Sequence, residues 1–557
     1  MKFSRFLVGT LACTLFAACS NEENPAVDNG TQGQKGEQAF IAVNLVAPDV
    51  ASRATYQEGT NDENAVTNAR FYFFNGDAIA KVSGTGQNAV NYIELNNTTE
   101  VGEGNFNFNF TDDDDTNSDN VEKTSDAILV LDNCPIKPNQ MVVILNPTGL
   151  DNQSKSLDDL EKVKGTYATS ALTSSGKFVM SNSVYKDNGD VNNTVNVGNY
   201  IYENADAAEL DPVKVYVERV VAKVEATQGT NKEAITNTTS FDTEEDFDAG
   251  SGETSVKAKI TGWTIGNRSS ISFLLKNLDN ITTDPFENWN APHDSRSYWA
   301  VMPTATDGNS LTNDKTWSEI NTYSAQYCEE RTGATSGEET VLLVAARLVL
   351  EGDENNGVTI AQYAGRLWTV DNLKAQFCSL ISRSDNKIYY KAQSTDPSWT
   401  LLTKDQVSFR KRTSDETASY EAYDAILTLA DNLDNYLFAK DSEGNTLYSN
   451  TEEVETVLKE YTALVYDNGK TYYYVPIKHA ENANSAINAV VRNHWYKINI
   501  TGVHGLGTPI PPLDEKDPDD EEEDIIPETP ENSNSYLAAE INILSWNIIS
   551  QDNVTLK

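Results

Sequence analysis

Side chains that could carry catalysis or bind a metal are few in this sequence. Its 557 residues include 5 Cys and 4 His, namely His293, His479, His494 and His504. The sequence lacks the G-x-S-x-G, H-E-x-x-H, Walker A and C-x-x-C patterns, whose spacings place nucleophiles, zinc ligands, phosphates or redox thiols. The acidic run from Asp112 to Asp115 is contiguous, whereas calcium loops space their carboxylates. We therefore predict no catalytic residues, no metal site, no cofactor and no enzyme activity.

One cysteine is predicted to be modified. Lys2 and Arg5 precede an apolar run, Phe6 to Ala18, that is shorter than the roughly 20 residues needed to span a bilayer. Small residues then come directly before Cys19, which is the pattern of a lipoprotein signal with the cysteine as the lipidated residue. An ordinary signal peptide cut after Ala18 is the alternative. The predicted contact with a membrane is only through the lipid of the precursor.

A second covalent change is predicted at Arg53. This residue lies among Ala51, Ser52, Ala54 and Thr55, small residues that suit an extended loop bound by a protease. We predict cleavage between Arg53 and Ala54 by an Arg-specific maturation protease. The alternative is a surface arginine without a role.

The three remaining cysteines are Cys134, Cys328 and Cys378. An odd number allows at most one internal disulfide in an oxidising compartment. A bond between Cys328 and Cys378 and a set of three free buried thiols are both open, because free cysteine is often a core residue.

The charge balance excludes several classes of partner. The chain has 84 acidic and 42 basic residues, a formal net charge of -42. Phosphate binding needs a basic surface, so we predict no nucleic-acid partner and no binding to an anionic membrane surface. The hydrophobic fraction of 39%, with 25 Tyr, 18 Phe and 8 Trp, is enough for folded cores.

Short runs rich in β-branched and aromatic residues recur along the chain, separated by Asn, Asp and Gly turns. The three phenylalanines at 106, 108 and 110 alternate with Asn, which places them on one strand face. Helical periodicity is sparse. The predicted strands are 40–46, 70–74, 127–131, 141–145, 213–224, 258–265, 297–302, 340–350, 422–429, 472–477, 495–500 and 538–549, and the predicted helices are 156–164, 370–382 and 452–462. This pattern predicts an all-β protein built of sandwich domains with a few short helices.

The composition changes sharply at 511–535, which contains five Pro and eleven Asp or Glu. Like charges repel and Pro cannot pair in a ladder, so this stretch is predicted to be an extended linker. Strand character returns after it. The segment 536–557 either folds into its own domain or completes the sheet of another molecule. Its predicted groove-filling residues are Ile541, Ile543, Trp546 and Ile548.

Several segments together resemble the fimbrillin family, the subunits of type V pili, and within it the shaft subunits of minor (short) fimbriae. The resemblance lies in the signal at Cys19 and in segments 52–55, 217–224, 472–479 and 490–502, of which the last two are the most specific. It implies two tandem transthyretin-like β-sandwich domains, export as a lipoprotein, and polymerisation by strand exchange after proteolysis.

The resulting domain prediction combines composition and resemblance. It assigns 1–18 to a lipoprotein signal peptide, 19–53 to a propeptide with a strand at 40–46, 54–227 to an N-terminal β-sandwich, 228–510 to a C-terminal β-sandwich, 511–535 to an acidic Pro-rich linker and 536–557 to a donor-strand candidate.

The functional prediction is a shaft subunit of a cell-surface fimbria that supports adhesion. Its predicted partners are other copies of itself, accessory fimbrial subunits, the maturation protease, and host or bacterial surface ligands. The alternatives are an accessory tip or anchor subunit, and a surface lipoprotein that binds glycans or proteins.

Overall fold

The computed structural model describes the following residues: 39–46, 60–96, 124–131, 134, 136–165, 172–173, 177–187, 190–203, 205–228, 240–248, 250, 252–278, 282–283, 298–299, 309–313, 316–320, 322, 324–332, 338–392, 397–412, 424–431, 433, 435–482, 485–510, 536–544 and 549–550.

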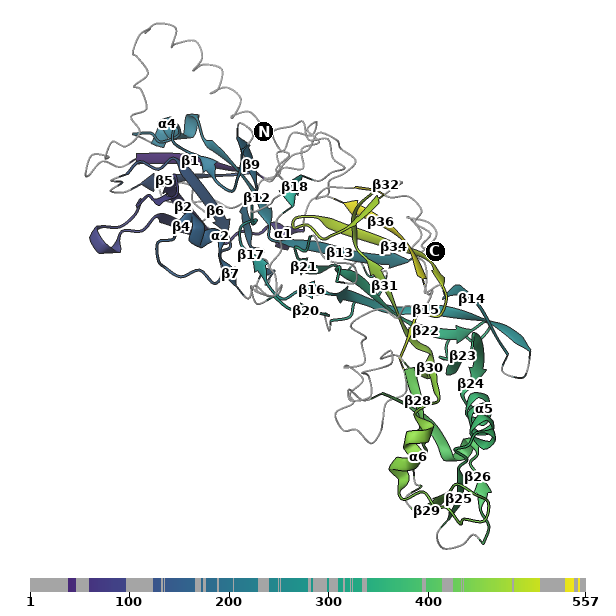
Figure 1. Ribbon diagram of the computed structural model, residues 1–557. Coiled ribbons are helices and arrows are strands. Elements are labelled where there is room, and N and C mark those ends of the chain that lie inside the picture. The colour runs from purple at the N-terminus through teal and green to yellow at the C-terminus, as the bar shows by residue number, and fades with distance from the viewer. Residues whose placement is uncertain are drawn as a thin grey trace.

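The described part of the chain is mostly β-strand, and its helices are short, which confirms the predicted all-β class. Three hydrophobic clusters organise it into three bodies, and Figure 1 shows that these follow one another in an elongated molecule. Each predicted helix is confirmed, as α2 (Leu157–Glu161), α5 (Val370–Arg383) and α6 (Thr451–Leu458). The Phe-Asn alternation at 106–110 lies outside the described residues.

The N-terminal body is built on one nine-stranded sheet. Its strands along the sheet are β3 (Ala78–Ile79), β2 (Asn68–Asn75), β6 (Gln140–Leu145), β8 (Met180–Asn182), β12 (Val213–Arg219), β1 (Ala39–Val46) and β5 (Thr124–Leu131), with β4 (Tyr92–Asn96) on β2 and β11 (Val195–Asn196) on β6. Aromatic and β-branched residues favour strands. The run from Phe71 to Phe74 and the run from Met141 to Leu145 accordingly form its fully buried centre.

The central body has two five-stranded sheets whose buried residues belong to one hydrophobic cluster, so they pack as a sandwich. The first sheet runs β21 (Gln326–Glu329), β13 (Val221–Gln228), β34 (Trp495–His504), β36 (Tyr536–Leu544) and β37 (Ile549–Ser550). The second runs β14 (Ser240–Asp248), β15 (Glu253–Gly266), β22 (Val341–Leu350), β31 (Lys470–Pro476) and β35 (Thr508–Pro509).

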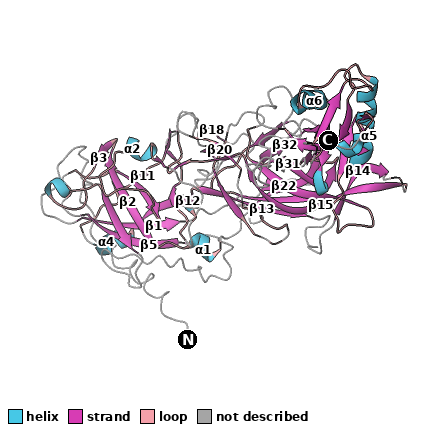
Figure 2. Ribbon diagram, turned by 90° about the horizontal axis from the view of Figure 1, so that it is seen from below, coloured by secondary structure: helices cyan, strands magenta, loops and turns pink. Residues whose placement is uncertain are grey.

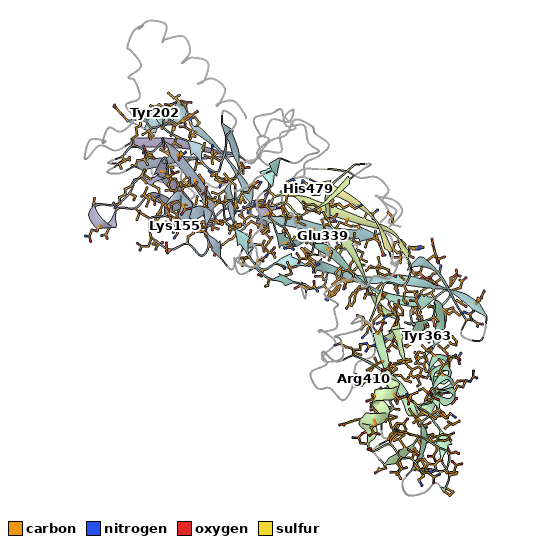
Figure 3. The ribbon with its side chains drawn as sticks, in the orientation of Figure 1. Lys155, Tyr202, Glu339, Tyr363, Arg410 and His479 are labelled. Carbon is orange, nitrogen blue, oxygen red and sulfur yellow. The ribbon has the colours of Figure 1, made fainter. Side chains whose placement is uncertain are left out.

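The third body is inserted between β22 and β31, two strands that pair directly from Val341 with Pro476 to Arg347 with Lys470. It contains α5, α6, a sheet of β24 (Arg366–Thr369), β23 (Ile360–Tyr363), β30 (Thr462–Tyr466), β28 (Asp424–Leu429) and β27 (Val407–Lys411), and a smaller sheet of β26 (Thr400–Leu401), β25 (Tyr389–Ala392) and β29 (Tyr436–Ala439). It has its own core, in which Tyr363 meets the Phe377 ring edge-on at 4.8 Å between centroids. Tyr363 and Arg410 mark this inserted body in Figure 3.

Helix α5 shows why the inserted body folds locally. The Thr369 hydroxyl accepts a hydrogen bond from the backbone N–H of Asn372 and so caps the first turn. Leu373, Phe377 and Ile381 recur every four residues and form the buried face of the helix.

The remaining elements are short. They are α1 (Asn61–Asn64), α4 (Ala205–Leu210), the 3₁₀ turns at 86–88, 404–406 and 467–469, and five two-stranded ribbons: β9 (Tyr185–Asp187) with β10 (Asp190–Asn192), β16 (Arg268–Ser269) with β20 (Leu311–Thr312), β17 (Ser272–Phe273) with β7 (Lys164–Gly165), β18 (Thr282–Thr283) with β19 (Tyr298–Trp299), and β32 (Lys478–Asn482) with β33 (Ser485–Asn488). In the described residues, no helix combines the length and the apolar character that crossing a membrane requires.

The predicted strand 213–224 is divided between two bodies. It forms β12 in the N-terminal sheet and β13 in the central body, with Val220 between them. Figure 2, seen from below, shows β12 and β13 following one another from the N-terminal body into the long strands of the central body. This crossing is the junction between the two bodies.

Candidate assembly site

Strand β1 lies inside the N-terminal sheet. It pairs with β12 in parallel from Val43 with Val213 onward, and with β5 in antiparallel along its whole length. The neighbouring residues Val213 and Val215 of β12 and Ala127 of β5 are almost fully buried and belong to the core of the body. A sheet without β1 would therefore present two unpaired strand edges beside apolar side chains.

Strand β36 pairs with β34 of the same chain. The pairing runs antiparallel from Trp495 with Leu544 to His504 with Tyr536, with a register shift at Ile500 and Gly502. Of the predicted groove-filling residues, Ile541 lies opposite Ile498 and Ile543 opposite Tyr496, while Trp546 and Ile548 lie outside the described residues. In this single chain the C-terminal segment thus adds a strand to its own central body, and its role as a donor to another copy stays a prediction.

The two predicted sites of covalent change, Cys19 and the Arg53–Ala54 bond, lie outside the described residues. The next basic residue after Arg53 is Arg70 in β2, whose side chain is only 5% exposed. Its guanidinium donates to the Glu94 carboxylate at 2.9 Å and to the Asp151 carbonyl at 2.7 Å. A folded N-terminal body therefore protects Arg70 from a protease that requires an extended substrate.

Helix α1 follows the predicted cleavage site and is held at the junction. The Glu63 side chain is 1% exposed, and its carboxylate lies 2.7 Å from Lys223 Nζ of β13 and accepts a hydrogen bond from the Tyr327 hydroxyl. Burial by itself raises the pKa of Glu63, but the bonds from Lys223 and Tyr327 outweigh it and leave that pKa below its ordinary value. The Arg219 guanidinium donates to the Glu63 carbonyl at 2.9 Å. Helix α1 is thus fixed to β12 and β13.

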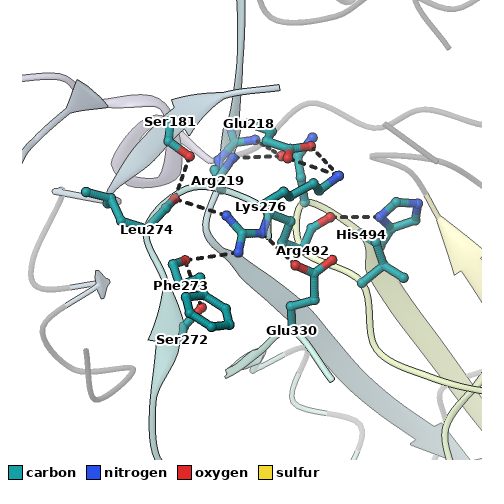
Figure 4. A network of polar contacts seen from close by, with 12 residues as sticks. Ser181, Glu218, Arg219, Ser272, Phe273, Leu274, Lys276, Glu330, Arg492 and His494 are labelled. Atoms are coloured by element: carbon teal, nitrogen blue, oxygen red, sulfur yellow. Dashed lines mark hydrogen bonds and ion pairs between the residues drawn. The ribbon is translucent and has the colours of Figure 1, made fainter. Parts of the chain in front are cut away.

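A second polar network lies at the junction, and Figure 4 shows its hydrogen bonds and ion pairs. Lys276 Nζ lies 3.0 Å from Glu218 of β12, and neither side chain is exposed. Arg492, just before β34, donates to Glu330 at 2.8 Å and to the carbonyl of Leu274 at 3.1 Å. These bonds connect strand β12 of the N-terminal body with segments that lead into the central body.

The energetics of this network follow from its burial. Taking charges out of water is costly, and their attraction repays the cost only when the pairing is complete. Burial raises the pKa of Glu218, and the cations of Lys276 and Arg492 offset only part of that rise. The network therefore favours one relative arrangement of the two bodies, because any other would leave a buried charge without its partner.

The described cysteines and His479, which the sequence offers as reactive or metal-binding side chains, lie in the structural core or its loops. Among the described residues, Cys134, Cys328 and Cys378 form no disulfide, and Cys328 and Cys378 are buried in the central and inserted bodies respectively. His479 Nδ1 lies 2.9 Å from the Tyr496 hydroxyl in the central body (Figure 3). Among the described residues, no cluster of three His, Cys, Asp or Glu could hold a metal ion.

Sequence reasoning missed the inserted body and the Lys276 network. A signal for the network exists, since Lys276 is the only charged residue in the apolar run 271–278. Lys223, in the predicted strand 213–224, pairs across the junction with Glu63 of α1.

Comparison with known proteins gives a family match in the C-terminal part of the chain. Residues 464–552 match the family model of the major fimbrial subunit protein type IV, fimbrillin, C-terminal. This range includes β31, β34 and β36. No curated protein shows significant similarity to the sequence.

Solved structures align along most of the chain at low similarity. A fimbrilin from Porphyromonas gingivalis W83 is 13% identical, with 92% of this chain and 99% of that chain covered and a TM-score of 0.34. A putative cell adhesion protein from Bacteroides eggerthii is 11% identical, with 92% and 98% covered and a TM-score of 0.33. The truncated tip fimbrial protein Mfa3 from Porphyromonas gingivalis is 10% identical, with 83% and 95% covered and a TM-score of 0.28. The match of residues 464–552 to the fimbrillin C-terminal model thus confirms the resemblance to the fimbrillin family that the sequence indicated.

Proposed function

We propose that the protein is a structural shaft subunit of a cell-surface fimbria. It is exported as a lipoprotein through Cys19, cut after Arg53 and joined to the next copy by donor-strand exchange. The observation that carries the proposal is the position of β1, which fills the sheet between β12 and β5 yet precedes Arg53 in the chain. The match of residues 464–552 to the fimbrillin C-terminal model supports the fimbrial assignment.

The proposed mechanism follows from strand pairing. Cleavage after Arg53 frees β1 from the rest of the chain, and its departure leaves backbone N–H and C=O groups of β12 and β5 unpaired. The C-terminal segment 536–557 of a second copy then enters as a replacement strand. The segment 511–535 serves as its tether, because an extended chain gains about 3.3 Å per residue and so spans several tens of ångströms.

The strength of such a joint is set by burial and ordering. Each apolar side chain that enters the groove contributes about 1.5–3 kcal/mol, so four contribute roughly 6–12 kcal/mol. Ordering about ten residues costs a comparable amount. The durability of the fimbria then comes from slow strand release rather than from a large equilibrium affinity.

The proposed partners are other copies of the chain, accessory fimbrial subunits and an Arg-specific protease, at the cell surface. The role is non-enzymatic, and the surface ligands to which the fimbria adheres belong to the host or to other bacteria. Only a shaft subunit forms long filaments by itself, which separates this proposal from a tip subunit, an anchor subunit or an independent binding lipoprotein.

Maturation is tested on protein recovered from the cell surface. N-terminal sequencing is expected to begin at Ala54, and Arg53→Lys is expected to leave the precursor uncut and without filaments. Lys35→Gln, a charge change in the same N-terminal segment, is the matched control, and it is expected to be cleaved and to form filaments like the wild type. Surface protein that still begins at Cys19 would contradict the maturation step.

The donor role is tested by ending the chain after Pro512. This end point keeps β35 and the buried Ile510, whose N–H donates to the Lys470 carbonyl at 3.2 Å. Donor exchange predicts a folded monomer that forms no filaments. Loss of folding in the central body would instead identify β36 as a permanent strand of its own domain, and filaments from the truncated chain would refute the donor role.

A further inference from the structure

The two strands at opposite ends of the chain carry the same residue pattern. Strand β1 ends in Val43-Asn44-Leu45-Val46, and β36 ends in Ile541-Asn542-Ile543-Leu544. In both, an aliphatic residue precedes an asparagine, and two aliphatic residues follow it. Successive strand residues alternate between the two sheet faces, so in both strands the asparagine lies on the face opposite to its aliphatic neighbours.

The place of Asn44 in the N-terminal sheet is polar on both sides. It lies opposite Lys214 of β12 and opposite Asp126 of β5. The next position along β1, Leu45, lies opposite Val215, which is fully buried in the core of the body. On the β12 side the slot of β1 therefore alternates between a polar and an apolar neighbour at these positions.

The pairing of β36 with β34 follows the same alternation. Asn542 lies opposite Lys497, whereas Ile541 and Ile543 lie opposite the buried Ile498 and Tyr496. Ile541 and Ile543 of β36 thus lie opposite apolar or aromatic residues of β34, and Asn542 lies opposite a lysine.

We propose that Asn542 sets the register of the donor strand, by taking the place of Asn44 between Lys214 and Asp126 of the next copy. In this register Ile541 takes the place of Val43, and Ile543 that of Leu45. The inference rests on the proposed donor-strand exchange and adds the residue that determines its register.

Registers shifted by two residues fit worse. A shift toward the start of β1 places Asn542 at Ala42, opposite Ile128, a buried residue that packs with Ala208 of α4. It also places Leu544 at the polar position between Lys214 and Asp126. An unpaired buried amide is disfavoured, and a register shift by one residue would exchange the two faces of the strand entirely. A shift in the other direction carries Ile543 past Val46, the end of β1.

The register is tested by disulfide formation between two full-length proteins that are matured and polymerised together. One carries Ile543→Cys and the other carries Ser125→Cys, because Ser125 lies opposite Leu45. The matched control replaces Ser125→Cys by Ala127→Cys, which is opposite Val43 and would meet residue 543 only in the shifted register. Wild-type protein, matured and polymerised in the same way, shows any disulfide-linked dimer that forms through Cys134, Cys328 or Cys378.

We expect a reducible dimer from the Ser125→Cys pair in at least about tenfold excess over the Ala127→Cys pair, which corresponds to about 1.4 kcal/mol between registers. Adding Asn542→Leu to the Ile543→Cys protein is expected to raise the share of the shifted bond. Three outcomes would overturn the inference without contradicting strand exchange. They are an excess of the disulfide to Ala127→Cys, filaments that contain neither disulfide, and an unchanged disulfide ratio when Asn542→Leu is added. Matured wild-type protein that forms no filaments would refute the exchange itself.

Discussion

Replacing Lys276 by methionine tests the buried network at the junction. Met keeps much of the apolar stem but removes the ammonium group that lies 3.0 Å from Glu218, and both side chains are unexposed. Glu218 would then be a buried carboxylate without its ion-pair partner, a change that costs about 3–5 kcal/mol in other proteins. We expect Lys276→Met to destabilise the junction by an amount in this range at pH 7.

The pH dependence of that loss can be derived from proton linkage. The Glu218 carboxyl of the variant can avoid its charge by binding a proton, which costs about 1.4 kcal/mol per pH unit above its ordinary pKa of 4.5, or about 3.4 kcal/mol at pH 7. Its folded pKa is raised, so the variant binds more protons when folded, and its stability falls as pH rises through this window. Loss of the Lys276 cation raises the pKa of Glu218 further than in wild type, so the loss of stability relative to wild type should shrink as pH falls from 7 toward 5.

Native-state hydrogen exchange is the suitable assay, because a chain of several bodies is not expected to unfold in a single two-state step. Amides of β12 and of segment 271–278 should lose protection in Lys276→Met and regain most of it in Glu218→Leu with Lys276→Met, since a buried pair can be replaced by apolar residues at little cost. Lys162→Met, which removes an exposed partner of Asp158, is the control and should change nothing. A loss that is independent of pH, or absent, would refute the reasoning.

Three further predictions concern other parts of the molecule. Glu63→Gln should destabilise the junction at neutral pH. The pKa of Glu63 is lowered in the folded protein, so its stabilising contribution is lost as pH falls below 4.5 through that folded pKa. In urea titrations the difference in stability between the variant and wild type should therefore disappear over this range. Gly469→Ala should lower the free energy of unfolding, measured by urea titration, by more than the control Gly365→Ala does. Gly469 has φ +71° and an added Cβ would lie 2.3 Å from the Leu348 carbonyl oxygen. Gly365 has φ +70° with no atom within 4 Å, so its replacement carries only the backbone strain of about 1–2 kcal/mol. Thiol labelling of the native protein should be slow at pH 8 at Cys134, since burial raises its pKa to about 11, and denaturation should make all three mature-region cysteines react at similar rates.

Local chemistry in the sequence predicted most of the secondary structure. The strands 213–224 and 340–350 were predicted from β-branched alternation and apolar runs, and helix 370–382 from its periodicity. Of the predicted range 297–302 the structure describes Tyr298–Trp299, which form a strand, and the predicted helix 156–164 is shorter, at Leu157–Glu161. Strand signals are local, because they depend on side-chain alternation within a few residues.

The inserted body could not be seen in the same way. Its strands have the same period of two as those of the central body, so nothing local shows that β22 pairs with β31 across it. Pairing between distant segments is decided by which apolar faces can be buried together, and the separate core of the inserted body follows from that choice.

The β-rich class, the net charge of -42 and the shared pattern of strands β1 and β36 follow from residue type and spacing alone, which also predict a lipoprotein signal at Cys19 and a linker at 511–535. The tertiary structure decided that β1 lies between β12 and β5, that β36 lies beside β34, and that Glu218 meets Lys276 at the junction. These pairings join residues that are far apart in the chain. Their free energy comes from burial and from hydrogen bonds that exist only after the sheets have formed.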